Sequence, residues 1–282
     1  MRRLGVSMRL ILGAVGGMAG RLLLLICLFV PAPLRGHAQS EDLDQYKLRL
    51  TGFWWFSQPS GYFDGKNQSG EFDLGRDFHF GSYSTFTGNV DWRFKRKHHL
   101  ICGFSPVSYS KSAILLRTIS FQGETYDVGT RVSSDVNSLS VAPGYQWDFI
   151  RRDRGFVALA TQIYLLKTDA KLTGTVFVNG HTATGTASGS FFAPLPVLGP
   201  RARWYPLDSD RLALEGIVQG MYFFGYGDFY SARGQADIGL SRHWKATAGY
   251  QVGTRLSIHG GSNNIGIRLT QKGAVVGIEG SW

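Results

Sequence analysis

Cysteine is scarce in this sequence, with only Cys27 and Cys102 among 282 residues. Cys27 lies in an N-terminal segment that we expect to be removed, so the mature chain would hold one thiol, no internal disulfide and no cysteine metal cluster. No apolar run is long enough to cross a bilayer as a helix. A mean hydropathy of −0.08 likewise argues against a bundle of membrane helices.

Acidic residues are absent from the first 38 positions, where five arginines stand. The net charge of the whole chain is +10, and these arginines carry half of it. The remaining basic excess is small and scattered along the sequence. It does not form the dense basic surface that nucleic-acid binding requires, so we expect no nucleic acid among the partners.

The N-terminal arginines precede an apolar run, Leu22–Val30, that has the length of a secretory signal core and ends at Pro31. Small residues follow, and we predict cleavage between Ala38 and Gln39. Three methionines could start such a peptide: Met1, Met8 and Met18. The predicted organisation is a cleaved signal peptide, a short periplasmic leader and one domain, over residues 1–38, 39–45 and 46–282.

Apolar and polar residues alternate over long stretches, and residues 211–250 show the pattern best. Leu212, Leu214 and Val218 fall on one parity, whereas Glu215 and Gln219 fall on the other. A period of two indicates β-strands. A soluble sandwich would turn the apolar face inward, whereas a transmembrane barrel turns it toward lipid. Because the polar face carries full charges and aromatic residues stand at the ends of the apolar face, the pattern favours the barrel.

We predict an all-β protein, a closed antiparallel up-and-down transmembrane β-barrel of roughly ten strands, with eight or twelve as alternatives. The expected connections alternate between short turns and longer Gly-rich loops. Pro194, Pro196 and Pro200 predict a distortion or bulge in one strand. The expected strands are approximately residues 46–56, 78–94, 99–121, 126–149, 156–168 and 190–205, three within 211–250, and one within 265–282.

The sequence closes on alternating apolar residues, Val276 and Ile278, and on a terminal aromatic residue, Trp282. This ending resembles the C-terminal insertion signal of outer-membrane barrels, although Gly280 departs from it. With the alternation and the N-terminal segment, the mature chain resembles the small outer-membrane β-barrel superfamily, OmpA-like in style. The resemblance implies the outer membrane of a diderm bacterium. The partners it implies are membrane lipid and lipopolysaccharide, periplasmic chaperones and the insertion machinery.

Charged residues on the inward parity are the first candidate functional set. Paired with one another they would plug a narrow barrel, whereas in a wider one they would favour anions. We expect a non-enzymatic barrel, either structural and surface-exposed or weakly pore-forming, with a porin-like but charge-paired lumen. The predicted inward set is Lys47, Arg49, Arg201, Arg203, Glu215, Arg233, Asp237, Lys245, Arg268 and Glu279.

An outer-membrane hydrolase is the alternative function. Asp77 and His79 form an Asp-x-His pair beside a predicted loop, and omptin proteases use such a pair with two further acids to activate water. The other two acids with suitable spacing, Asp42 and Asp44, lie in the leader at the opposite end of the predicted barrel. No nucleophile elbow is present, so a catalytic site is not the first prediction. Nor does the sequence predict a metal site or a cofactor.

Overall fold

The computed structural model describes residues 42–64, 71–75, 77–78, 81–121, 124–178, 181–223, 227–258 and 266–282. The predicted cleavage site between Ala38 and Gln39 lies outside the described residues. In the described part of the chain, no helix is long and apolar enough to span a membrane.

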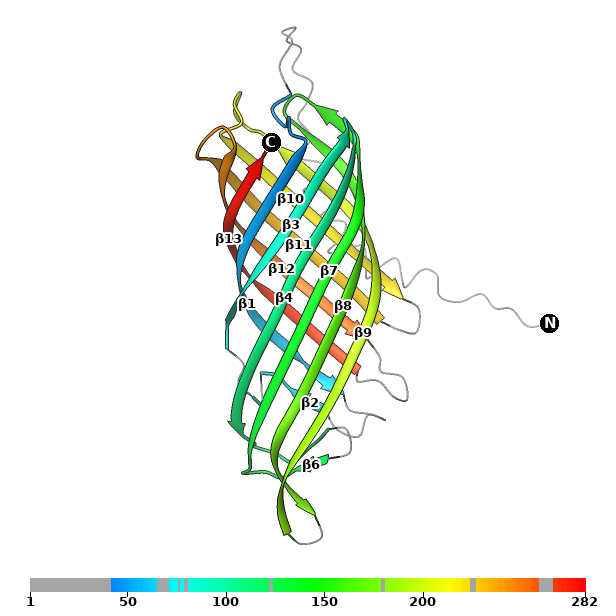
Figure 1. Ribbon diagram of the computed structural model, residues 1–282, viewed down its shortest axis with the longest axis vertical. Helices are drawn as coiled ribbons and strands as arrows, with labels where there is room; N and C mark the ends of the chain where they lie inside the picture. Colours follow the sequence, from blue (N-terminus) through cyan, green and yellow to red (C-terminus); the bar gives the residue numbers. More distant parts are fainter. Residues whose placement is uncertain are drawn as a thin grey trace, which may run out of the picture. The chain divides into compact units, whose positions relative to one another are not determined.

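Ten long antiparallel strands form the wall of a barrel (Figure 1). Three further strands, β2 (Glu71–Asp73), β5 (Ile119–Phe121) and β6 (Glu124–Tyr126), lie in the connections between them. The wall strands are β1 (Leu48–Asp64), β3 (Tyr83–Lys95), β4 (His98–Ile114), β7 (Arg131–Arg152), β8 (Gly155–Val178), β9 (His181–Trp204), β10 (Leu212–Phe223), β11 (Gly227–Gly239), β12 (Trp244–Ile258) and β13 (Gly266–Ser281).

The barrel closes because the first wall strand pairs with the last. The β1–β13 ladder is continuous from Arg49 opposite Ser281 to Asp64 opposite Gly266. Every other wall strand pairs with its neighbour in the sequence. The prediction of an all-β, closed antiparallel barrel of ten strands is therefore confirmed, and the alternatives of eight and twelve strands are wrong.

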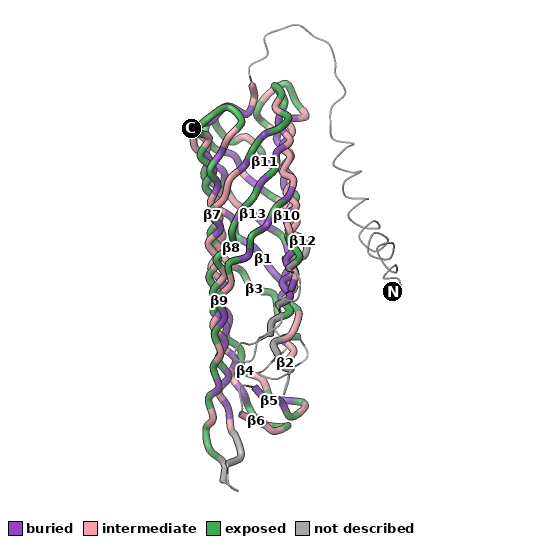
Figure 2. Tube along the Cα trace, turned by 90° about the vertical axis from the view of Figure 1, so that its right-hand side faces the viewer, coloured by how far each residue is buried: buried purple, intermediate pink, exposed green. Residues whose placement is uncertain are grey.

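The two faces of the wall differ in polarity. Because successive side chains of a strand point to opposite faces, buried and exposed positions alternate along each strand, as Figure 2 shows. Large apolar side chains remain exposed on the outside, among them Leu50, Trp54, Phe86, Val90, Leu139, Leu159, Ile238, Val276 and Ile278. Polar and charged side chains are buried inside. An apolar exterior around a polar interior is the arrangement of an outer-membrane β-barrel.

The two ends of the barrel differ in their connections. At one end the turns are short, from β3 to β4, β7 to β8 and β11 to β12, and the C-terminus lies there (Figure 1). This pattern marks the periplasmic end. Five tryptophans near it fit a membrane-interface belt: Trp92, Trp147, Trp204, Trp244 and Trp282. At the other end, the hairpin of β8 and β9, each 24 residues long, projects beyond the shorter strands.

Strand β9 runs through all three prolines that predicted a distortion. Its pairing with β8 is continuous. Its pairing with β10 runs from Trp204 to Arg201, is interrupted there, and resumes only at Leu198. Pro200 falls in this gap, and Pro194 and Pro196 lie beyond the last pair with β10. Because proline has no N–H to donate, it is tolerated where one neighbouring ladder is missing. The irregularity thus affects one side of the strand only.

Gly280, the departure from the C-terminal pattern, has a packing explanation. The indole of Trp282 meets that of Trp244 edge to face, with ring centroids 5.4 Å apart. A Cβ atom at position 280 would lie only 2.5 Å from the Trp282 ring. The glycine therefore leaves room for the terminal indole to fold back over the outer wall.

Candidate functional site: the barrel lumen

Arg203 on β9 is the centre of the polar network in the periplasmic half of the barrel. Its side chain is fully buried. One terminal nitrogen, Nη1, donates to Glu215 on β10 at 2.8 Å and to Glu279 on β13 at 2.9 Å. The same atom lies 3.0 Å from a carboxylate oxygen of Asp237 on β11. The other nitrogen, Nη2, donates to Glu279 at 2.8 Å. One guanidinium therefore joins three carboxylates from three other strands.

Arg201, two residues earlier on the same strand, extends the network across the lumen. Its guanidinium donates to both oxygens of Glu215 at 3.2 Å. It also donates to Asp91 on β3 at 3.0 Å and to Gln146 on β7 at 2.8 Å. Arginine suits this position because its planar fork of donors can bind several acceptors at once.

His99 on β4 lies between two carboxylates. Its Nδ1 atom is 2.8 Å from Asp91, and its Nε2 atom is 3.1 Å from Asp148 on β7. Tyr46 donates to the same Asp91 at 3.0 Å. The neighbouring His98 instead contacts the hydroxyl of Tyr145. In the part of the chain that the structure describes, no group of three or more His, Cys, Asp or Glu side chains could hold a metal ion.

The chain before β1 enters the mouth of the barrel at Asp44, which is completely buried. Its carboxylate pairs with Arg49, lies 3.2 Å from Arg151, and accepts a 2.7 Å hydrogen bond from Tyr205. Burial alone would raise the pKa of Asp44, but the charges of Arg49, Arg203 and Arg151 hold it well below its ordinary range. This part of the predicted leader therefore belongs to the lumen.

The structure brings together most of the predicted inward set. Lys245 is buried beside the ring of Tyr205, with its ammonium 4.9 Å from the ring centroid. Seven more of the set are placed inside the barrel: Arg49, Arg201, Arg203, Glu215, Arg233, Asp237 and Glu279.

The predicted inward placement is wrong for two members of the set. Lys47 precedes β1 and is exposed at the rim, where its backbone N–H bonds the carbonyl of Trp282. Arg268 is exposed and stacks over the ring of Tyr62, 5.2 Å from its centroid. Its parity along β13 matches that of outward-facing Val276, which the sequence assignment overlooked.

Sequence reasoning missed several members of the network. Asp91 carried a readable signal, because it alternates with the outward-facing Val90 and Trp92. His99 begins a predicted strand and Arg151 closely follows another, but neither was included in the inward set. Asp44 had no signal, since nothing in a polar leader predicts which residue folds back. The missed members are Asp44, Asp91, His99, Gln146, Asp148, Arg151 and Tyr205.

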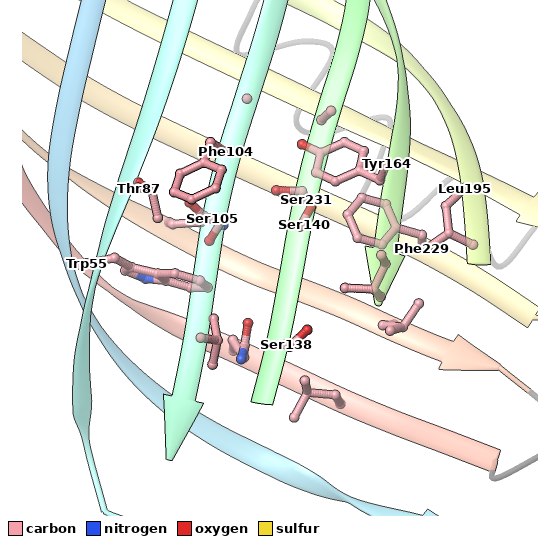
Figure 3. A pocket seen from close by; sticks show the side chains of 18 of the residues that line it. Trp55, Thr87, Phe104, Ser105, Ser138, Ser140, Tyr164, Leu195, Phe229 and Ser231 are labelled. Atoms are coloured by element: carbon pink, nitrogen blue, oxygen red, sulfur yellow. The ribbon is translucent and has the colours of Figure 1, made fainter. Parts of the chain in front are cut away.

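Above the network, toward the long-loop end, the lumen becomes apolar. It holds a cavity of about 150 Å³. Trp55 lies on one side, and Tyr164, Phe229 and Leu195 lie on the other (Figure 3). Small polar residues such as Ser231 complete the lining. The barrel interior therefore consists of a charged part and an apolar chamber with different chemistry.

Residues of the extracellular connections pack over this chamber as a roof. Leu74, Phe78, Leu115, Ile119, Phe121 and Tyr126 form one buried cluster with apolar residues of the wall. An ion pair joins two of these connections, because Arg117 donates to Asp77 with distances of 2.9 and 2.7 Å. The carboxylate of Asp77 also accepts the backbone N–H of Asp73. His79, its partner in the hydrolase hypothesis, lies outside the described residues.

No family model and no curated protein matches the sequence. Similar solved structures include the outer membrane protease OmpT from Escherichia coli, at 9% identity and a TM-score of 0.47, covering 87% of this chain and 99% of that one. Another is the transport unit of the autotransporter AIDA-I from Escherichia coli, at 11% identity and a TM-score of 0.37, covering 95% of this chain and 98% of that one. A third is Ail, the attachment invasion locus protein of Yersinia pestis, at 7% identity and a TM-score of 0.32, covering 82% of this chain and 99% of that one. These likenesses concern architecture alone.

Proposed function

We propose that the protein is a non-enzymatic barrel of a diderm outer membrane whose lumen the charge network closes. The observation that carries the proposal is the set of contacts made by Arg203, which links strands β9, β10, β11 and β13 across the interior. With Arg201 reaching Asp91 on β3, paired side chains occupy the lumen near its periplasmic end. A barrel of about ten strands leaves room inside for little more than side chains.

A planar-bilayer recording tests this proposal. The wild-type barrel is expected to show no steady ion conductance, because the carboxylates and guanidinium groups neutralise one another and fill the cross-section. The variant Arg203→Ser, Glu279→Ser removes one cation and one anion together, and it should produce measurable openings. Steady channels from the wild-type protein would contradict a closed lumen and favour a weakly pore-forming barrel.

The outer parts of the barrel support a surface-exposed role. The β8–β9 hairpin projects past the shorter strands (Figure 1). Lys167 and Asp169 on β8 form an exposed ion pair. Val276, Ile278 and Trp282 lie exposed on the outer face of the C-terminal segment. We propose that they engage the insertion machinery after a signal peptide has delivered the chain, and that lipid and lipopolysaccharide surround the mature barrel.

The hydrolase alternative has less support, because both oxygens of Asp77 are held by Arg117. We interpret this pair as a clamp in the roof.

The substitution Asp77→Asn is expected to speed tryptic cleavage after Arg117 several-fold, since the loosened connections open more often. The control Asp169→Asn changes an exposed pair and should leave digestion unchanged. Equal digestion of Asp77→Asn and wild type would contradict the clamp.

A further inference from the structure

Arg233 on β11 is partly buried, and it differs from Arg49, Arg201 and Arg203 in its charge partners. Its Nε atom is buried and has no hydrogen-bond partner. In the described part of the chain no carboxylate forms an ion pair with it. The nearby acids are engaged elsewhere, because Glu215 binds Arg201 and Arg203, and Asp237 lies against Arg203. The guanidinium of Arg233 lies over the ring of Phe53, whose centroid is 4.6 Å from the guanidinium carbon.

The apolar chamber is where this cation meets open space. Arg233 lines the cavity together with Tyr164, Phe229 and Leu256. The volume of about 150 Å³ matches that of an engineered apolar cavity that admits benzene. In Figure 3 the rings of Trp55, Tyr164 and Phe229 surround this space. Uncharged polar side chains such as Asn89 and Gln271 line it as well. The chamber therefore offers aromatic rings, uncharged hydrogen-bonding groups and one positive charge.

We propose that the chamber binds a small amphipathic monoanion, with its carboxylate on Arg233 and a body about the size of one benzene ring among the aromatic side chains. A cation held inside the barrel without a carboxylate partner is unfavourable, and a ligand carboxylate would supply the acceptor through charge-assisted hydrogen bonds. The apolar body would gain by leaving water. This inference does not depend on whether the charge network closes the lumen to ions.

Calorimetric titration of the full barrel in lipid nanodiscs tests the inference with two probes of matched shape. Phenylacetate carries the carboxylate, and phenylacetamide is its neutral isostere. Phenylacetate is expected to bind saturably, with one site per barrel, and at least tenfold more tightly than phenylacetamide. Arg233→Met should weaken the binding of phenylacetate at least tenfold and leave that of phenylacetamide unchanged. The control Arg131→Met alters an exposed arginine at the start of β7 and should change neither affinity.

A second variant keeps the test decisive if Arg233→Met does not fold, as judged by heat-modifiable gel mobility. Ser231→Trp retains the cation but fills the cavity, and it should abolish binding of both probes. Equal wild-type affinities for the two probes would overturn the role of Arg233. Absence of any phenylacetate binding to the folded wild-type barrel, or unchanged binding to folded Ser231→Trp, would overturn the site itself.

Discussion

Replacing Arg203 with methionine is expected to lower the free energy of unfolding by about 3–5 kcal/mol, the usual cost of removing one partner from a buried ion pair. Glu215, Asp237 and Glu279 would then face one another without the cation that binds all three. Methionine keeps most of the side-chain volume, so the loss reports on charge rather than on a cavity.

Urea unfolding in lipid vesicles, followed by tryptophan fluorescence, measures the effect of Arg203→Met. Lys47→Met is the matched control, because Lys47 is exposed at the rim, and it should cost less than about 0.5 kcal/mol. Adding Glu279→Gln to Arg203→Met removes one of the carboxylates that lost Arg203 and should recover part of the loss. A cost for Arg203→Met as small as that of the control would show that the network does not stabilise the barrel.

The substitution Asp44→Asn should destabilise the barrel by about 3 kcal/mol at neutral pH and have a shrinking effect in acid. The folded-state pKa of Asp44 lies far below its ordinary value of 3.8, because Arg49, Arg203 and Arg151 outweigh the cost of burial. A depressed folded pKa means that the carboxylate contributes its stability above the unfolded pKa. That contribution is lost as the pH falls from about 4 toward the folded pKa.

The measurement compares the unfolding free energies of wild type and Asp44→Asn at several pH values between 7 and about 2.5. The difference should be constant down to about pH 4 and then decrease. Asp210→Asn changes an exposed carboxylate in the turn before β10 and serves as the control. A difference that grows in acid, or one that is independent of pH throughout, would contradict the assignment.

The wall of the barrel could be predicted from the sequence because period-two alternation is a local property of each strand. Glu215 and Asp237 were placed inside by the apolar neighbours that flank them. The same rule, applied to Asp91 beside Val90 and Trp92, would have found another member of the network. Arg268 was wrongly included because its position was not compared with that of Val276, which has the same parity on β13 and faces outward.

The remainder of the lumen could not be predicted, because it depends on contacts between distant parts of the chain. Asp44 accepts a hydrogen bond from Tyr205, 161 residues away. The apolar chamber forms only when residues such as Trp55, Tyr164 and Phe229 from different strands meet. Arg233 looks like any inward arginine in the sequence, and only the geometry shows that its neighbouring carboxylates already have partners.

The seam between β1 and β13 has a consequence for assembly. Glu279 lies on β13, while the two arginines with which it forms ion pairs, Arg49 and Arg203, come from β1 and β9. A partly built sheet in which the first and last strands have not met would hold Glu279 without Arg49. Enclosing such an unpaired charge in hydrocarbon is strongly unfavourable. Intermediates in which β1 and β13 are only partly paired should therefore be sparsely populated, and barrel closure should be a single cooperative step.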